Sequence, residues 1–268
     1  MPHAVHHGIE RPKQLDSNCK DEPIRPGPHR LRLLGVRLLW RLSVAQRVAL
    51  QILFTRLLTV ISISTSCSGT DAPLLVWREL ALALEEVIGV KITIKHVFSC
   101  EKDKCKRDFL TRVWPGIPRI FCDVLGLSSG SPALCHDGSC KLPGDCGFGH
   151  AHYSGFPCTS ASNLNPHSQT HANLNCIKTC TDATGSVFDS LARALAQQDD
   201  LIFIVLENVL SLCEGSNLDE VLSRLQGIGF LVKVSLSISS FCKQFLFFHI
   251  FNHTAFRAFY YLELLYLL

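Results

Sequence analysis

The chain has 268 residues, of which 47% are hydrophobic and 18% charged, a composition that suits a globular protein with one sizeable core. A formal net charge of +3 is too small to identify a polyanionic partner by itself. The 13 cysteines follow an N-terminal region without an apolar signal segment, so we expect reduced thiols and an intracellular compartment rather than a secreted disulfide framework.

The N-terminal part of the chain divides into two segments. Residues 1–28 are rich in Pro, His and charged side chains, which is typical of a disordered tail. Residues 29–58 place leucines and valines between arginines and predict one basic amphipathic helix. No acidic residue lies between Glu22 and Asp71. We expect a solvated surface helix, with phosphate binding and organelle targeting as alternatives.

Residues 59–234 alternate between strand-like and helix-like segments, the pattern of an α/β protein with a mostly parallel sheet flanked by helices. The run at 201–209 is almost entirely apolar, as expected for a buried central strand. Within this region, Pro73 and Gly89 mark the start and the end of the first expected helix, 74–89. The expected strands are 59–64, 96–101, 119–125, 201–209 and 230–234, and the expected helices are 74–89, 102–113, 185–197 and 218–229.

The C-terminal residues 235–268 do not continue this alternation, and we expect an apolar tail of unclear structure. Two apolar stretches raise the question of a membrane span. The stretch 48–64 is short and contains Arg56, whereas 244–268 is interrupted by polar side chains such as His249 and Glu263. We therefore expect no stable membrane partner.

Acidic residues end two neighbouring strands of the expected sheet. Glu101 ends the second strand, where an acid can accept hydrogen bonds from ribose hydroxyls, and Asp123 follows the third, where it can hold an adenine amino group. The first strand ends in a turn with Gly69, before a helix start that can receive an anion. No GxGxxG or P-loop signature is present, so the pattern favours a nucleoside with a short charged tail, such as S-adenosylmethionine.

Cys158 and Glu207 are the candidates for chemistry at the same edge. Cys158 follows Pro157 in a loop, where nearby helix N-termini can lower a thiol pKa. Glu207 ends the most apolar strand and can act as a proton donor. A thiolate that adds to C6 of a pyrimidine while an acid protonates N3 makes C5 nucleophilic enough to accept a methyl group.

Six segments resemble, in order, the motifs of the C5-cytosine-specific DNA methyltransferase family: CSGTDAP, FSCEKD, IFCDVL, GFPCTS, TGSVFDS and LENV. The resemblance covers about residues 60–232. It implies a Rossmann-like, S-adenosylmethionine-dependent methyltransferase fold and a cytosine flipped out of the DNA duplex into the pocket. It also implies a nuclear or other intracellular DNA-containing compartment. The alternative function is that of a tRNA cytosine-5 methyltransferase of the same family.

The resemblance also assigns roles by position. Cys158 would be the nucleophile, and Glu207 with Asn208 would hold the cytosine. The residues that would bind the cofactor are Ser68, Gly69, Thr70, Asp71, Glu101, Lys102, Asp123, Val124 and Pro157.

The chain departs from the family pattern at several places. Residues 144–155 have almost no strand propensity where an apolar strand should precede the Pro-Cys loop. Thr159 stands where the family has Gln. An arginine-bearing strand, a target-recognition region and a final motif are not recognisable in 235–268. We therefore expect a core of 59–234 that is incomplete at its C-terminal side, with an inactive nucleic-acid-binding relic as the alternative.

Two other segments have simpler interpretations. A Cys/His-rich segment could bind zinc, although its spacing is not that of a standard finger, and free cysteines are the commoner case. The polar segment 165–175 predicts a flexible loop beside the cleft. The potential zinc ligands are Cys135, His136, Cys140, Cys146, His150, His152, Cys176 and Cys180.

Overall fold

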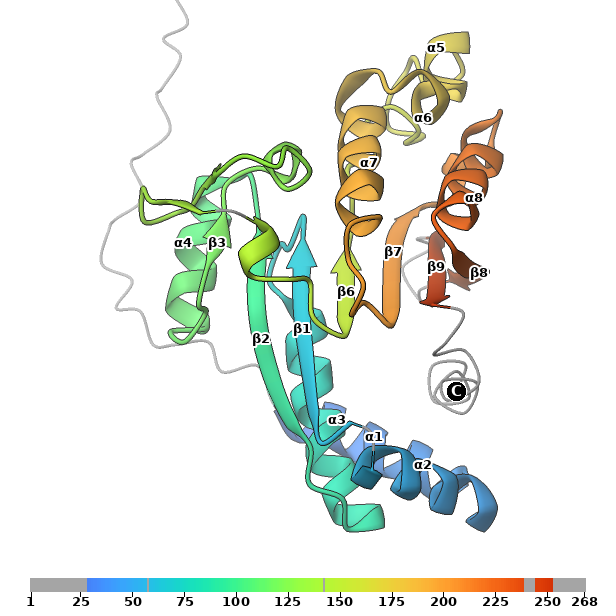
Figure 1. Ribbon diagram of the computed structural model, residues 1–268. Coiled ribbons are helices and arrows are strands. Elements are labelled where there is room, and N and C mark those ends of the chain that lie inside the picture. The colour runs from blue at the N-terminus through green and yellow to red at the C-terminus, as the bar shows by residue number, and fades with distance from the viewer. Residues whose placement is uncertain (1–27, 57, 142, 239–243, 253–268) are drawn as a thin grey trace, which may run out of the picture.

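A computed structural model describes residues 28–56, 58–141, 143–238 and 244–252. The predicted tail 1–28 lies outside these residues except for Pro28, as do residues 253–268. Seven strands form one sheet in the order β3-β2-β1-β6-β7-β9-β8 (Figure 1). Their bounds are β1 Val60–Ser66, β2 Thr93–Cys100, β3 Ile120–Phe121, β6 Ala151–Ser154, β7 Phe203–Val209, β8 Phe230–Ile238 and β9 Gln244–Asn252.

The sheet has the connectivity of a doubly wound α/β fold. β3, β2, β1, β6 and β7 are mutually parallel, and β9 pairs antiparallel with both β7 and β8. The strand order reverses between β1 and β6, and ligands of such sheets bind outside the carboxyl ends of the strands at this switch point. The α/β Rossmann-like prediction is confirmed, and the sheet places a ligand site beside β1 and β6.

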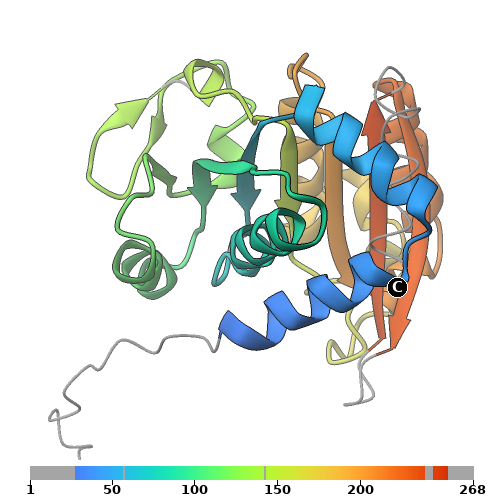
Figure 2. The same ribbon diagram turned by 90° about the horizontal axis from the view of Figure 1, so that it is seen from below.

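Helices cover both faces of the sheet (Figures 1 and 2). On one face, α3 (Ala72–Ile88) packs with α1 (Pro28–Arg41) and α2 (Val44–Arg56) against apolar side chains of β1, β6 and β7. On the other, α7 (Asp182–Leu195) and α8 (Asn217–Gly227) belong to a second core cluster. β7 contributes alternate side chains to the two clusters. Phe203 and Val205 belong to the cluster beneath α3, and Ile204 and Leu206 belong to the cluster beneath α7. α4 (Lys104–Val113) closes the β3 edge.

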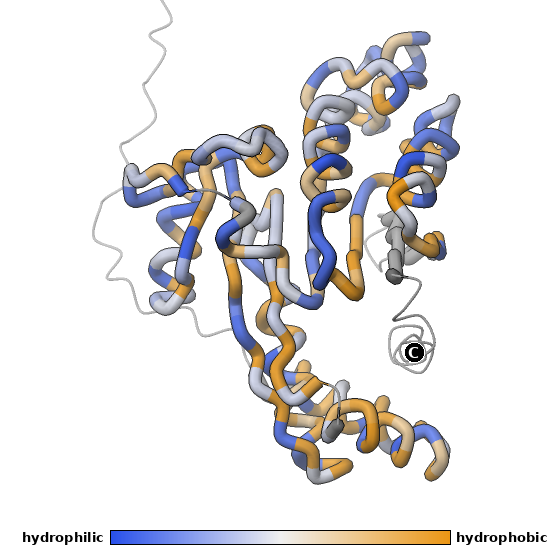
Figure 3. The backbone as a smooth tube through the Cα atoms, in the orientation of Figure 1, coloured by the Kyte–Doolittle hydropathy of each residue, from blue (hydrophilic) through white to orange (hydrophobic). Residues whose placement is uncertain are grey.

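The predicted single helix at 29–58 is wrong, because the structure has two helices there. α1 spans Pro28–Arg41 and α2 spans Val44–Arg56, and Figure 3 shows hydrophobic and hydrophilic residues mixed along the pair. The Ser43 hydroxyl accepts from the Gln46 backbone N–H at 3.2 Å, while the Ser43 N–H donates to the Gln46 side chain at 2.8 Å. This reciprocal capping box starts a new helix at that point.

β6 forms where the sequence predicted almost no strand. Its four residues pair with β1 on one side and β7 on the other, so its backbone groups are satisfied by two neighbours. The chain enters β6 through Gly149, which has φ +76°. A Cβ there would lie 2.8 Å from the Ser62 carbonyl oxygen, so only glycine lets the backbone approach β1 this closely.

Short elements replace several predicted features. The strand predicted at 119–125 is limited to β3, and a 3-10 turn, η1 (Val124–Gly126), follows it. The segment 165–175 is not simply a loose loop, since it contains α5 (His171–Leu174) and continues into α6 (Cys176–Thr179). The remaining short elements are β4 Ala133–Leu134, β5 Cys140–Lys141, η2 Pro143–Asp145 and η3 Leu210–Cys213.

The C-terminal boundary expected at 234 falls inside β8, which continues to Ile238. Residues 244–252 form β9 and insert between β7 and β8, so part of the apolar tail, for which the sequence predicted no clear structure, joins the sheet. Its alternation of aromatic and aliphatic residues lacks a polar face, and this hides the strand period in the sequence. The apolar stretch 48–64 is divided between α2 and β1. Among the described helices, none has the length and hydropathy that crossing a membrane requires.

Candidate active site

A cavity of about 240 Å³ lies at the carboxyl edge of the parallel strands. Its walls come from the ends of β1, β2, β3 and β6 and from α7, and it therefore sits at the switch point of the sheet. Residues predicted to bind a cofactor supply half of its lining. The lining residues are Cys67, Cys100, Glu101, Lys102, Lys106, Asp123, Val124, Gly155, Pro157 and Val187.

Glu101 directly follows β2, and its buried carboxylate accepts hydrogen bonds from two backbone N–H groups. The backbone N–H of Gly69 donates to its Oε2 at 2.9 Å, and the N–H of Asp103 donates to its Oε1 at 2.9 Å. Each carboxylate oxygen has a second lone pair, so both can accept a further hydrogen bond. The bond from Gly69 also ties the turn after β1 to the end of β2.

Asp123 follows β3 and faces the same cavity. Its Oδ1 accepts from the Leu125 N–H at 3.0 Å and so caps η1. Its Oδ2 lies 3.7 Å from the Lys102 ammonium in a largely exposed ion pair. The cap on η1 thus fixes the position of the Asp123 carboxylate through Oδ1, while Oδ2 stays accessible to a ligand.

The turn after β1 organises the strand ends more than it lines the cavity. The Ser68 hydroxyl donates to the Cys100 carbonyl at 3.1 Å and joins β1 to β2. Ser68, Gly69, Thr70 and Asp71 are all absent from the cavity wall. Gly69 acts through its N–H on Glu101, and the Thr70 carbonyl accepts from the Trp114 indole at 3.5 Å.

Asp71 points into the core rather than toward the cavity. It is fully buried, and Thr65 and Ser99 donate hydroxyl hydrogen bonds to its carboxylate. Burial raises the pKa of Asp71, while these hydrogen bonds act against that rise. It precedes α3 in a left-handed conformation and makes no side-chain cap, so its role in the fold is to link β1 and β2 through Ser99.

The Pro-Cys loop is anchored to β7 and α7. The Asn208 amide donates to the Phe156 carbonyl at 3.0 Å, directly before Pro157. The Ser160 N–H donates to the Thr184 hydroxyl at 3.2 Å, in the segment that starts α7. Asn208 is 1% exposed, so its hydrogen bond is shielded from water. The loop that carries Cys158 is therefore held on both sides.

Cys158 and Glu207 lie close enough to influence each other electrostatically. Burial raises the pKa of Cys158, and the Glu207 charge raises it further. This is opposite to the lowering expected from helix N-termini. Burial also raises the pKa of Glu207. A Cβ added at Gly155 would lie 3.1 Å from Glu207 Oε2, so the carboxyl group rests directly against the loop.

Several cavity residues were not predicted, although most lie within the recognised motifs. Cys67 opens the CSGTDAP segment, Gly155 opens GFPCTS and Val187 lies inside TGSVFDS. A motif identifies a segment but not which of its side chains turns inward. Burial, and then the Glu101 charge, raise the pKa of Cys67 to about 12, so this thiol stays protonated.

Two histidines of the Cys/His-rich segment form hydrogen bonds with serines of β1. His152, fully buried on β6, lies 2.8 Å from the Ser64 hydroxyl and 3.0 Å from the Ser66 hydroxyl. His150 bonds the neighbouring Ser62. Within the described ranges, no group of three or more His, Cys, Asp or Glu side chains could hold a metal ion.

The chain was compared with family models, curated proteins and solved structures. No family model matches the chain. It is 33% identical over 103 residues, 38% of its length, to the DNA (cytosine-5-)-methyltransferase DMT5 of Cryptococcus neoformans var. grubii. That segment is 4% of the relative's length.

Solved structures are similar at low identity. The chain aligns with a DNMT2 mutant of Spodoptera frugiperda at a TM-score of 0.49 and 13% identity, covering 72% of this chain and 50% of that one. Dnmt2 of S. pombe gives 0.45 and 12%, with coverages of 72% and 50%. A putative class I S-adenosylmethionine-dependent methyltransferase of Listeria monocytogenes gives 0.46 and 10%, with 84% and 68%.

The name of the matched relative agrees with the family that the ordered motifs resemble. The resemblance indicated by the motifs is supported by this match, in which 103 residues of the chain are similar to a DNA (cytosine-5-)-methyltransferase.

Proposed function

We propose that the chain is the catalytic core of a DNA cytosine-5 methyltransferase, with Cys158 as the nucleophile and Glu207 as the acid. The observation that carries this proposal is the convergence at one edge of the sheet. Glu101, Asp123 and Pro157 line one cavity, and the Cys158–Glu207 pair adjoins it through Gly155. These residues come from strand ends that are far apart in the sequence.

The cavity suits the nucleoside part of S-adenosylmethionine. Its 240 Å³ is below the roughly 300 Å³ at which small-molecule sites begin, so it would enclose only part of the cofactor. Glu101 and Asp123 offer acceptors for hydroxyl and amino groups, and Val124 and Val187 supply apolar walls. When bound, the cofactor supplies an electrophilic methyl group. Lys102 and Pro157 complete the contacts that we propose.

The electrostatics of the pair suit a coupled proton transfer. Burial and the Glu207 carboxylate hold Cys158 in its thiol form, and burial raises the pKa of Glu207, so this carboxylate accepts a proton more readily. Moving one proton from Cys158 to Glu207 would give a thiolate beside a carboxylic acid without adding net charge to the site. The thiolate can add to C6 of cytosine while the acid protonates N3. After C5 has taken the methyl group, the C5 proton leaves to water, elimination at C6 releases the thiolate, and the N3 proton returns to Glu207.

Asn208 contributes to the same chemistry by holding the loop. Its hydrogen bond to the Phe156 carbonyl fixes the backbone next to Pro157 and Cys158. The cytosine must leave the duplex to reach such a pocket, which makes double-stranded DNA with a flipped base the proposed substrate. This substrate would place the protein in the nucleus or another DNA-containing compartment.

The test is covalent trapping on a duplex that contains 5-fluorocytosine, in the presence of S-adenosylmethionine. Fluorine at C5 cannot leave as a proton, so an active enzyme remains attached. We expect a denaturation-resistant adduct with the native chain and none with Cys158→Ala. Cys213→Ala removes another half-buried thiol with a raised pKa and should leave trapping unchanged.

Two further arms separate the alternatives. Glu207→Gln should slow adduct formation about 100-fold or more, because it keeps the shape but cannot deliver the proton. A single-stranded RNA with 5-fluorocytidine tests the RNA substrate, and trapping on RNA alone would replace DNA in the proposal. If the native chain forms no adduct on either polymer, the catalytic role is wrong and the relic interpretation is favoured.

A further inference from the structure

A second cavity, of about 210 Å³, lies at the β3 edge of the sheet, away from the proposed active site. It forms between the end of α4, the residues that lead into β3 and the turn that joins β4 to β5. It shares no lining residue with the first cavity. An inference about its ligand therefore does not depend on the methyl-transfer proposal.

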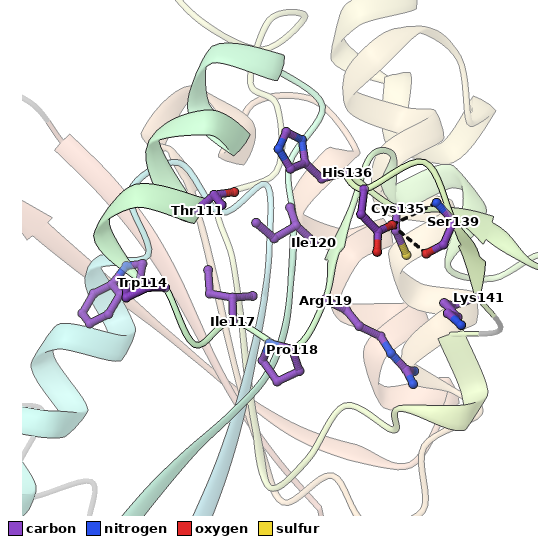
Figure 4. A pocket seen from close by; sticks show the side chains of 12 residues that line it. Thr111, Trp114, Ile117, Pro118, Arg119, Ile120, Cys135, His136, Ser139 and Lys141 are labelled. Carbon is purple, nitrogen blue, oxygen red and sulfur yellow. Dashed lines mark hydrogen bonds between the residues drawn. The ribbon is translucent and has the colours of Figure 1, made fainter.

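One side of this cavity is apolar and the other is cationic. Figure 4 shows Ile117, Pro118 and Ile120 in its centre, with Arg119 and Lys141 along one side. Ile120 is buried and belongs to the cluster beneath α4. The apolar side would contact a flat apolar group, and the cationic side would contact an anion.

The two cations are available for a ligand. None of the ion pairs between described residues involves Arg119 or Lys141. Arg119 uses one N–H on the Cys146 sulfur, which orients the guanidinium and leaves further donors. A guanidinium is well suited to carboxylates because its parallel N–H groups match the two oxygens.

Asp137 limits the charge that the cavity can accept. Its Oδ1 accepts from the Ser139 hydroxyl at 2.6 Å and from the Ser139 N–H at 2.9 Å. These hydrogen bonds lower the pKa of Asp137, so the residue remains a carboxylate. His136 is engaged with Asp108 at 3.5 Å. With Arg119 and Lys141 opposed by Asp137, the lining carries about one excess positive charge, which matches a monoanion better than a dianion.

The volume sets the size of the apolar part. A dry cavity of about 150 Å³ in another protein accommodates benzene. The 210 Å³ found here leaves room for one six-membered ring and a short polar substituent. Larger, drug-sized ligands need roughly 300 Å³ or more.

We propose that this cavity binds a small carboxylic acid with a single apolar ring, its carboxylate held by Arg119 and Lys141 and its ring packed on Ile117, Pro118 and Ile120. The probe is phenylacetate, with phenylacetamide as the neutral isostere. In titration calorimetry on the full chain, we expect saturable binding of phenylacetate below about 10 mM, and affinity for the amide about tenfold weaker.

Variants test the assignment of the cations. Arg119→Gln and Lys141→Gln should each weaken phenylacetate binding, Arg119→Gln by about tenfold or more. Lys141 is exposed, so its variant should fold even if Arg119→Gln does not. Lys178→Gln removes an exposed cation on α6 and should leave the affinity unchanged.

Four results would overturn the proposal. These are an absence of saturable binding, equal affinity for the amide, unchanged affinity in Lys141→Gln, and displacement of phenylacetate by S-adenosylhomocysteine, which would place the probe in the first cavity. Tighter binding of phenyl phosphate than of phenylacetate would contradict the monoanion assignment.

Discussion

β6 and β7 lie side by side in the centre of the sheet, and they are stabilised in different ways. β7 is apolar from Phe203 to Leu206, and its side chains fill the core on both faces. β6 buries four residues of which His152 and Ser154 are polar. β7 is stabilised by its own apolar side chains, whereas β6 depends on neighbours for its hydrogen bonds. A strand can thus be buried for reasons that its own sequence does not contain.

The largest expected effect is on β7. Leu206→Ala removes a fully buried side chain from the core beneath α7 and should lower the free energy of unfolding by about 3–4 kcal/mol. Urea denaturation followed by circular dichroism measures this change. A loss below about 1 kcal/mol would mean that β7 is not the apolar centre of the sheet.

The entry to β6 should be nearly as sensitive. Gly149→Ala places a Cβ 2.8 Å from the Ser62 carbonyl oxygen at a residue with φ +76°, and should destabilise the fold by about 2–3 kcal/mol. Gly116→Ala is the matched control, because its Cβ would meet nothing within 4 Å. Equal stability of the two variants would contradict the close approach of this glycine to β1.

The pH dependence of stability separates β6 from β7. Burial lowers the pKa of His152 to about 3, below its ordinary value of 6.5, so the folded protein keeps this histidine neutral while the unfolded chain protonates it. Stability should therefore fall as the pH drops from 6.5 toward 3, by about 2 kcal/mol between pH 6.5 and 5. Burial also lowers the pKa of His96, to about 4, which adds to the same slope.

His152→Asn provides the comparison for that profile. Denaturation midpoints across this pH range should show a smaller slope in the variant, because only His96 and other groups still titrate. Leu206→Ala should keep the full slope, since it changes packing without changing a titrating group. An unchanged slope in His152→Asn would mean that His152 is not held neutral on β6.

The smallest effect is expected where the two strands meet. Asn208→Ala leaves the Phe156 carbonyl without its donor and should destabilise the fold by about 1–2 kcal/mol. Adduct formation on 5-fluorocytosine DNA should fall more than this stability change explains, since the loop before Cys158 loses its anchor. If Asn208→Ala forms the adduct as fast as the native chain, Asn208 does not position the loop that carries Cys158.

Much of the fold could be predicted because amphipathic and apolar periods are local. α3, with Pro73 near its start and Gly89 after its end, lies where expected, and so does β7. The break between α1 and α2 could also have been predicted, because Ser43 and Gln46 have the spacing of a capping box. β6 and β9 could not be predicted, because their strand conformation depends on pairing with β1, β7 and β8.

For the candidate site, the sequence by itself determined the residue types and their order: an acid after β2, another after β3, a Pro-Cys loop and a glutamate at the end of β7. Only the tertiary structure decided where the side chains point and what charge they carry. It turns Asp71 into the core and raises rather than lowers the pKa of Cys158, because burial and a neighbouring carboxyl depend on the packing of distant segments.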